Sequence, residues 1–173
     1  MHVPAQISET LLFEGEPLLM CATPLEPWLR QQGLELSNDN ASERCLRGYL
    51  GLWKLHRAHL YLAGLRPFSR HGVLPWDGYS NEMAERSLSG LFPDARGPVC
   101  AAWFSGQLRC PVGRILAYRD GAYGAVHERD MLVDVVAGHV ERIVFRHNDV
   151  ELLPLPAVPR RRAAWSPSAR STS

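Results

Sequence analysis

The stretch Tyr49-Leu-Gly-Leu-Trp-Lys-Leu-His56, followed by Arg57-Ala58 and His59-Leu-Tyr-Leu-Ala63, decides the fold class of this 173-residue chain. Apolar residues recur on both sides of a short break, which is the pattern of a β-hairpin. Side chains alternate along a strand, so a turn at 57–58 places five of them on one face. These five are Tyr49, Trp53, Leu55, Leu60 and Leu62.

Three further segments show the same pattern and predict hairpins. Their ranges are 10–20 with a turn at Glu14-Gly15, 99–110 with a turn at Ser105-Gly106, and 131–145 with a turn at Ala137-Gly138. In the last of these, a simple two-residue loop sets Asp134 opposite Glu141, a like-charge pair. A glycine bulge at Gly138 would relieve that repulsion.

The four cysteines are expected to carry free thiols. In the hairpin expected over 99–110, Trp103, Leu108 and Cys110 share one face and Cys100 lies on the other. A disulfide needs both sulfur atoms close together, so a Cys100–Cys110 bridge is not expected. Cys45 lies between two arginines, which would favour a reactive thiolate. The preferred interpretation is a structural cysteine at the start of a strand.

These patterns predict a mainly β fold, an antiparallel meander of hairpins that forms a bent sheet, a partly open barrel or a small sandwich. One or two short helices are expected, one of them beginning near Pro24 or Pro27. A single domain over 1–155 is expected, with a long insert at 66–97. The Pro-, Arg- and Ser-rich segment 156–173 is expected to be a disordered tail.

Composition excludes several function classes. The chain has 18 acidic and 19 basic residues and a formal net charge of +1, which argues against a broadly basic nucleic-acid binder. Arg160-Arg161-Arg162 in the tail is weak evidence for such a role. No apolar run is long enough to cross a bilayer, and the first residues do not resemble a signal peptide, so a cytoplasmic protein is expected.

Two groups of side chains are the types that metal binding or catalysis requires. His56 and His59 flank a turn and could hold a metal with a third ligand, although two exposed histidines are the simpler interpretation. His127, Glu128 and Asp130 could support acid–base chemistry, although strand alternation favours a charged strand end. No catalytic residue, metal ligand or cofactor is therefore assigned, and the expectation leans against an enzyme.

Arginines accompany aromatic residues at three strand starts and turns, which is the composition of binding hot spots. The three segments are 47–53, 103–109 and 118–123. The candidate binding residues are Arg47, Tyr49, Arg109, Tyr118, Tyr123 and Glu128. The insert at 66–97 could cover this surface.

Five strings of the sequence carry a resemblance to other proteins: Leu46-Arg-Gly-Tyr-x-Gly-x-Trp53, Leu60-Tyr-Leu62, Leu91-Phe-Pro93, Trp103-Phe-Ser-Gly-x-Leu-Arg-x-Pro-x-Gly113 and Leu116-x-Tyr118. Together they resemble a group of small uncharacterised bacterial proteins. The resemblance covers roughly residues 7 to 145 and implies no activity or site. Small proteins of this kind are often partners of toxins, which is an analogy at the level of size and compartment.

The sequence supports two hypotheses about function. The first is a non-catalytic protein-interaction or accessory protein of a bacterium, of the immunity type, with a protein partner of unknown identity. The alternative is a small enzyme or ligand-binding barrel that acts on a polar metabolite through Glu, Asp and His side chains. A concave pocket with a strongly perturbed titratable group would favour the alternative.

Overall fold

The computed structural model describes residues 4–34, 44–67 and 88–148. Eight strands form one mixed sheet in the order β2-β1-β3-β4-β8-β7-β6, with β5 paired to β4. One α-helix and a single helical turn at 88–91 accompany the sheet. The elements are β1 (Glu9–Phe13), β2 (Glu16–Met20), α1 (Glu26–Gln32), β3 (Tyr49–His56), β4 (His59–Pro67), β5 (Val99–Cys100), β6 (Gly106–Tyr118), β7 (Ala125–Val136) and β8 (His139–His147).

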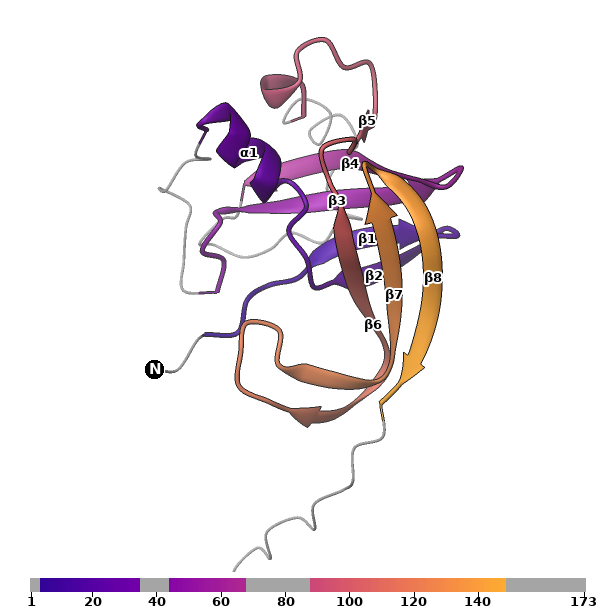
Figure 1. Cartoon of the computed structure of the whole chain (residues 1–173). Helices are drawn as coiled ribbons and strands as arrows, with labels where there is room; N and C mark the ends of the chain where they lie inside the picture. The colour runs from indigo at the N-terminus through magenta and orange to yellow at the C-terminus, as the bar shows by residue number, and fades with distance from the viewer. Residues whose placement is uncertain (1–3, 35–43, 68–87, 149–173) are drawn as a thin grey trace, which may run out of the picture.

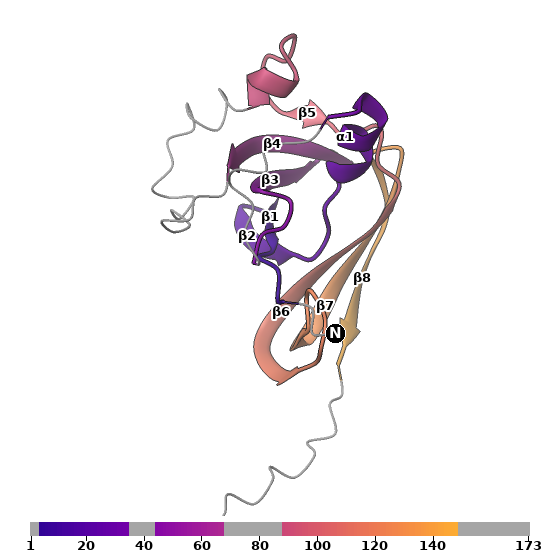
Figure 2. The ribbon, with the colours of Figure 1, turned by 90° about the vertical axis from the view of Figure 1, so that its left-hand side faces the viewer.

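The sheet bends so that β6, β7 and β8 run across β1 to β4 (Figures 1 and 2). The core lies between these two halves, where Trp53 and Leu62 meet Leu108 and Val133. The ends of the strand order approach each other where the Cys21 N–H donates to the Arg109 carbonyl at 2.8 Å. This contact does not extend into a ladder, and the sheet is not closed into a barrel. The mainly β fold predicted from the sequence is confirmed as one open, bent sheet, in which the pairing of β1 with β3 is parallel while the other strand pairs are antiparallel as expected.

Two predicted hairpins form with the predicted turns. Glu14 and Gly15 join β1 to β2, and Arg57 and Ala58 join β3 to β4. All four turn residues have positive φ, which matches the twist of an antiparallel pair. In the second hairpin the five predicted side chains pack into or against the same core. The predicted and observed faces of these five side chains agree, which indicates that burial of one face sets the register even where the turn lacks glycine.

The β7–β8 hairpin forms at the predicted turn, but its bulge lies elsewhere. Val135 pairs with Val140, while Asp134 pairs with Arg142, so Glu141 is the extra residue. The bulge was expected at Gly138. Its position at Glu141 replaces the like-charge pair with an ion pair, in which Arg142 contacts the Asp134 carboxylate at 2.9 Å.

The prediction of a hairpin over 99–110 is wrong. Only Val99–Cys100 is a strand there, and it pairs with β4, whereas β6 begins at Gly106 and pairs with β7. The intervening residues turn, with the Phe104 N–H donating to the Ala101 carbonyl at 3.0 Å. Cys100 and Cys110 therefore belong to different strand pairs, and both carry free thiols, as do Cys21 and Cys45.

Helix α1 contains Pro27 in its first turn, as the sequence predicts, and packs its aromatic residue against the 88–92 segment. The Trp28 and Phe92 rings lie 4.4 Å apart, and the Trp103 indole N–H donates to the Pro24 carbonyl at 2.8 Å. Neither α1 nor the turn at 88–91 is long and apolar enough to cross a membrane, and these are the helical segments of the described residues.

Several predictions fall on residues outside the described ranges. They are most of the loop at 33–44, most of the insert at 66–97 with its short helix over 80–88, and the tail at 156–173.

Candidate functional site

The N-terminal segment 4–8 joins two parts of the chain that are far apart in sequence. The Gln6 N–H donates to the Ala122 carbonyl at 2.7 Å, in the loop between β6 and β7. The Ile7 N–H donates to the Arg44 carbonyl at 2.8 Å, just before β3. Two polar clusters adjoin this junction, because Arg47 of one bonds to Ile7 and Arg109 of the other bonds to Tyr123, next to Ala122.

The first feature is a buried cluster, the Glu9 cluster, formed by Glu9, Arg47, Gly51 and Trp53. The Glu9 side chain is fully buried and accepts from Arg47 Nε at 2.9 Å and from the Trp53 indole N–H. The second guanidinium branch of Arg47 donates to the Ile7 carbonyl at 2.8 Å. A Cβ at position 51 would collide with the Glu9 carboxylate and lie 2.6 Å from Trp53 Nε1. Glycine is thus required where strand β3 passes the carboxylate.

Burial governs the electrostatics of this cluster. It raises the pKa of the Glu9 carboxyl, although the charge of Arg47 and hydrogen bonds from Trp53, Arg47 and Gly51 oppose the rise. Burial alone would lower the pKa of Arg47, but the Glu9 carboxylate, together with smaller contributions from Cys45, Tyr123 and Tyr49, outweighs burial and raises that pKa. The ion pair is therefore held in the interior by geometry that satisfies both charges.

Tyr49 lies beside this cluster and is also buried. Its hydroxyl donates to Glu26 Oε1 at 2.7 Å, and the Arg47 guanidinium lies 5.6 Å from its ring centroid. Burial and the neighbouring carboxylates raise the pKa of Tyr49. Arg47 and Tyr49 were predicted to line a binding surface; the structure places both in the interior.

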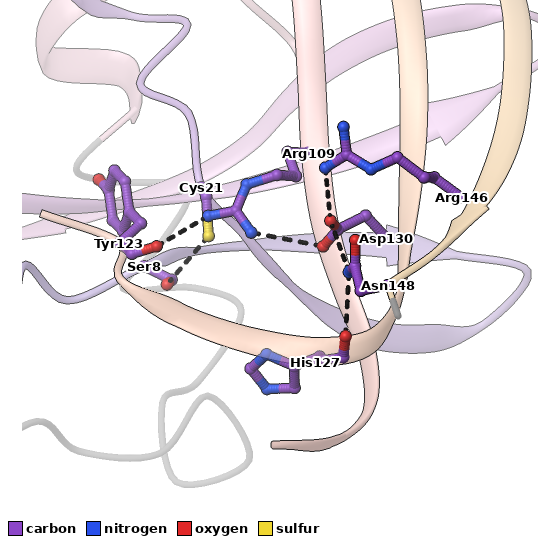
Figure 3. A network of polar contacts seen from close by, with 8 residues as sticks. All are labelled: Ser8, Cys21, Arg109, Tyr123, His127, Asp130, Arg146 and Asn148. Carbon is purple, nitrogen blue, oxygen red and sulfur yellow. Dashed lines mark hydrogen bonds and ion pairs between the residues drawn. The ribbon is translucent and has the colours of Figure 1, made fainter. Parts of the chain in front are cut away.

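The second feature is a polar cavity, the arginine pocket, whose charged walls include Arg109, Arg119, Arg146 and Asp130. Its volume is about 380 Å³. Asp130 accepts from Arg109 Nη1 at 3.3 Å and from Arg146 Nη2 at 2.8 Å (Figure 3). Asn148 Nδ2 donates to the same carboxylate at 3.0 Å. Three strands, β6, β7 and β8, thus meet at one buried acid.

Asp130 stays ionised in this setting. Burial would raise its pKa, but hydrogen bonds from Asn148 and Arg146 and the charges of Arg109 and Arg146 outweigh burial and hold the pKa below its usual value. Arg109 is fixed at its other end, where Nη2 donates to the Tyr123 carbonyl at 3.0 Å. The pocket is therefore built around a carboxylate that is ionised at neutral pH and orients two guanidinium groups.

A smaller cavity of about 160 Å³ shares Arg119 and Tyr123 with the arginine pocket and is lined mainly by apolar groups. Cys21 and His127 also line it, and His127 Nδ1 is buried with no hydrogen-bond partner in the described part of the chain. Burial raises the pKa of the Cys21 thiol, although Arg109 opposes this. The thiol is therefore protonated at neutral pH and is a poor nucleophile.

The structure brings only part of the predicted binding set together. Arg109 and Tyr123 meet in the arginine pocket, and Tyr118, with 78% of its surface exposed, lines the smaller cavity. Glu128 lies on the exterior, where it accepts from Arg114 Nε at 2.8 Å. The backbone N–H and guanidinium of Arg114 lower the pKa of Glu128.

The histidine pair and the cysteine that the sequence analysis considered as reactive groups also have defined positions. His56 and His59 face each other across the β3–β4 turn, and His59 contacts the His139 ring with centroids 5.1 Å apart. Within the described ranges no set of three or more His, Cys, Asp and Glu residues could hold a metal ion. Cys45 is buried and donates to the Tyr49 carbonyl at 3.4 Å, a structural position.

The central role of Asp130 was missed in the sequence, where it was assigned to a charged strand end. Its partners come from β6, from β8 and from Asn148 just beyond β8. The strand pairs could be found only from the register, which places Asp130 opposite Arg146 and Pro111. The Glu9 cluster was missed for the same reason, because 38 residues separate Glu9 from Arg47.

The third feature is an open strand edge on β8. This strand pairs with β7 along its length but meets β4 only at His59–His139, next to the turn. From 141 to 147 its outer edge pairs with no strand of the described chain (Figure 1). Ile143 and Phe145 pair with Val133 and Met131 and so share their core-facing side, yet they are 38% and 48% exposed.

A comparison with protein-family models, with curated proteins and with solved structures found no match for this chain.

Proposed function

We propose that the protein is a non-catalytic interaction protein that binds an extended segment of a partner protein along the open edge of β8. The observation that carries this proposal is the unpaired edge from 141 to 147 with exposed Ile143 and Phe145 beside it. A strand edge offers a row of backbone donors and acceptors to any segment that can extend alongside it. A bacterial accessory protein of the immunity type is one form such an interaction would take.

The chemistry of the edge defines the partner segment. Arg142 and Arg146 point to the other side of β8 and are already paired with Asp134 and Asp130. The groups left for a partner are the backbone of the edge and three exposed apolar side chains, Ile143 and Phe145 on one side of β8 and Val144 on the other. The matching segment is extended and carries apolar side chains at alternate positions, since successive strand residues face opposite sides.

The buried titratable groups support a non-catalytic role. Glu9 and Asp130 each hold at least one arginine, and the Cys21 thiol is protonated at neutral pH. Burial and the neighbouring Cys21 also raise the pKa of Cys110 to about 12. A cysteine nucleophile needs the opposite tuning, with its pKa lowered toward the working pH.

The test is affinity capture from the lysate of the protein's own host, with three versions of the tagged full chain. The wild type is compared with an Ile143→Asp/Phe145→Asp double variant and with Val136→Asp. Val136 is the matched control because it is 54% exposed and adjoins the same hairpin turn, on the opposite face from buried Val135. We expect the wild type and the control to retain one stoichiometric partner that the double variant loses.

Equal capture by all three baits would refute docking at this edge. Loss of the partner by both variants would also refute it, because Val136 lies off the proposed contact. The thermal midpoints of the three baits establish that each is folded before capture is compared. A wild-type bait that is folded and captures nothing counts against an interaction protein.

A further inference from the structure

We propose that the arginine pocket binds a small polar metabolite through a carboxylate or phosphate oxyanion, with Arg119 as its primary contact and Arg109 and Arg146 beside it. This inference is independent of partner docking on β8. It assigns a ligand class to a cavity that the proposed function does not use.

Two of the three arginines in the pocket, Arg109 and Arg146, are held in place by hydrogen bonds. The Arg109 guanidinium is fixed at both ends, by Asp130 at 3.3 Å and by the Tyr123 carbonyl at 3.0 Å. Arg146 reaches across from β8 to the same carboxylate at 2.8 Å. Each of these bonds uses part of a guanidinium group that has five N–H donors, so further donors remain for a ligand. Side chains fixed in advance lose less freedom when a ligand binds.

Charge within the pocket favours an anion. Its lining contains the three arginines Arg109, Arg119 and Arg146 against the two acids Asp120 and Asp130. Asp130 is matched by two of the arginines. Arg119 makes no side-chain hydrogen bond or ion pair with any residue that the structure describes, although its backbone N–H is bonded to Gly124 at 2.8 Å. The charged side chains of the lining therefore sum to one excess positive charge, and the Arg119 guanidinium has no side-chain partner among the described residues.

Size and geometry limit the ligand further. A volume of about 380 Å³ accommodates a small metabolite, at the lower end of the range for ligand pockets. The planar fork of arginine matches the paired oxygens of a carboxylate or phosphate, which a lysine would meet only as a point charge. Asn148 adds a further polar side chain to the lining.

The test is calorimetric titration of the full chain with inorganic phosphate and, separately, with succinate, in about 0.15 M salt to screen non-specific pairing. Wild type is compared with Arg119→Gln and with Arg114→Gln. Arg114 is the matched control because it is an exposed arginine near the same hairpin and is paired with Glu128 outside this pocket.

We expect at least one of the two anions to bind the wild type with saturation. Arg119→Gln should weaken its binding by about tenfold, equivalent to roughly 1.4 kcal/mol, while Arg114→Gln leaves it unchanged. Binding of phosphate alone assigns a phosphate ester, binding of succinate alone assigns a carboxylate, and binding of both assigns a general oxyanion site. Failure of both anions to saturate, or equal binding by the wild type and Arg119→Gln, would overturn the proposal.

Discussion

Replacing Arg47 with methionine should destabilise the protein strongly, because it leaves the carboxylate of Glu9 buried without its cation. Both side chains are almost fully buried, at 7% and 0% exposure. Breaking a buried ion pair from one side typically costs about 3–5 kcal/mol. A domain of this size has a total stability of about 5–15 kcal/mol, so Arg47→Met removes a large part of it.

A second substitution separates the charge from the packing. In the Arg47→Met background, Glu9→Gln removes the uncompensated charge and keeps an oxygen that accepts from the Trp53 indole. We expect the double variant to recover more than half of the lost free energy of unfolding. Arg114→Met is the matched control, since its ion pair with Glu128 is exposed and its loss should change stability little.

The pH dependence of stability is an independent test of the Glu9–Arg47 ion pair. Loss of Arg47 removes a charge that lowers the pKa of Glu9, so that pKa rises further above its usual value of 4.5. The unfolded chain then releases this proton at lower pH than the folded chain, so the variant loses stability as pH rises above 4.5. The gap between wild type and Arg47→Met should therefore widen with pH.

Urea unfolding at several pH values measures both effects. A cost below about 1 kcal/mol for Arg47→Met, the size seen for exposed pairs, would refute the buried-charge reasoning. A double variant no more stable than the single one would also refute it.

Three further substitutions test other contacts by the same unfolding assay. Gly51→Ala should cost about 1–3 kcal/mol, because its Cβ collides with Glu9 and Trp53; an unchanged midpoint would contradict that packing. Trp103→Phe should cost about 1 kcal/mol through the lost bond to Pro24, and no loss would mean that water replaces the indole. Asp130→Asn should have a lower free energy of unfolding than wild type at neutral pH. This difference should shrink as the pH falls below about 3.8, because the Asp130 carboxylate of the wild type then becomes protonated and loses its ion pairs. A gap independent of pH would show that the carboxylate charge is not the cause.

Hairpins with two-residue turns could be predicted from the sequence because the residues that specify them lie close together in the chain. The residues that flank the turn at 57–58 bury one face, and a slip of one residue would turn that face toward solvent. The hairpin expected at Ser105-Gly106 had a comparable local signal and did not form. There β6 pairs with β7, a longer partner that the local turn signal did not reveal.

Contacts between distant segments set the limit on predicting the site. The parallel pairing of β1 with β3 brings Glu9 to Trp53, and no local pattern announces it. Arginines beside aromatic residues were predicted to bind a partner. Their composition could not distinguish Arg47, which stabilises the interior, from Arg109, which lines a cavity.

The most direct test of partner docking is amide hydrogen exchange along β8, in the free protein and with a captured partner that has been purified. In an antiparallel strand alternate amides point away from the paired neighbour, so those facing the open edge should exchange quickly in the free protein. We predict that these amides between 141 and 147 become protected when the partner binds. Protection confined to another part of the chain, with these amides still exchanging quickly, would contradict docking on β8.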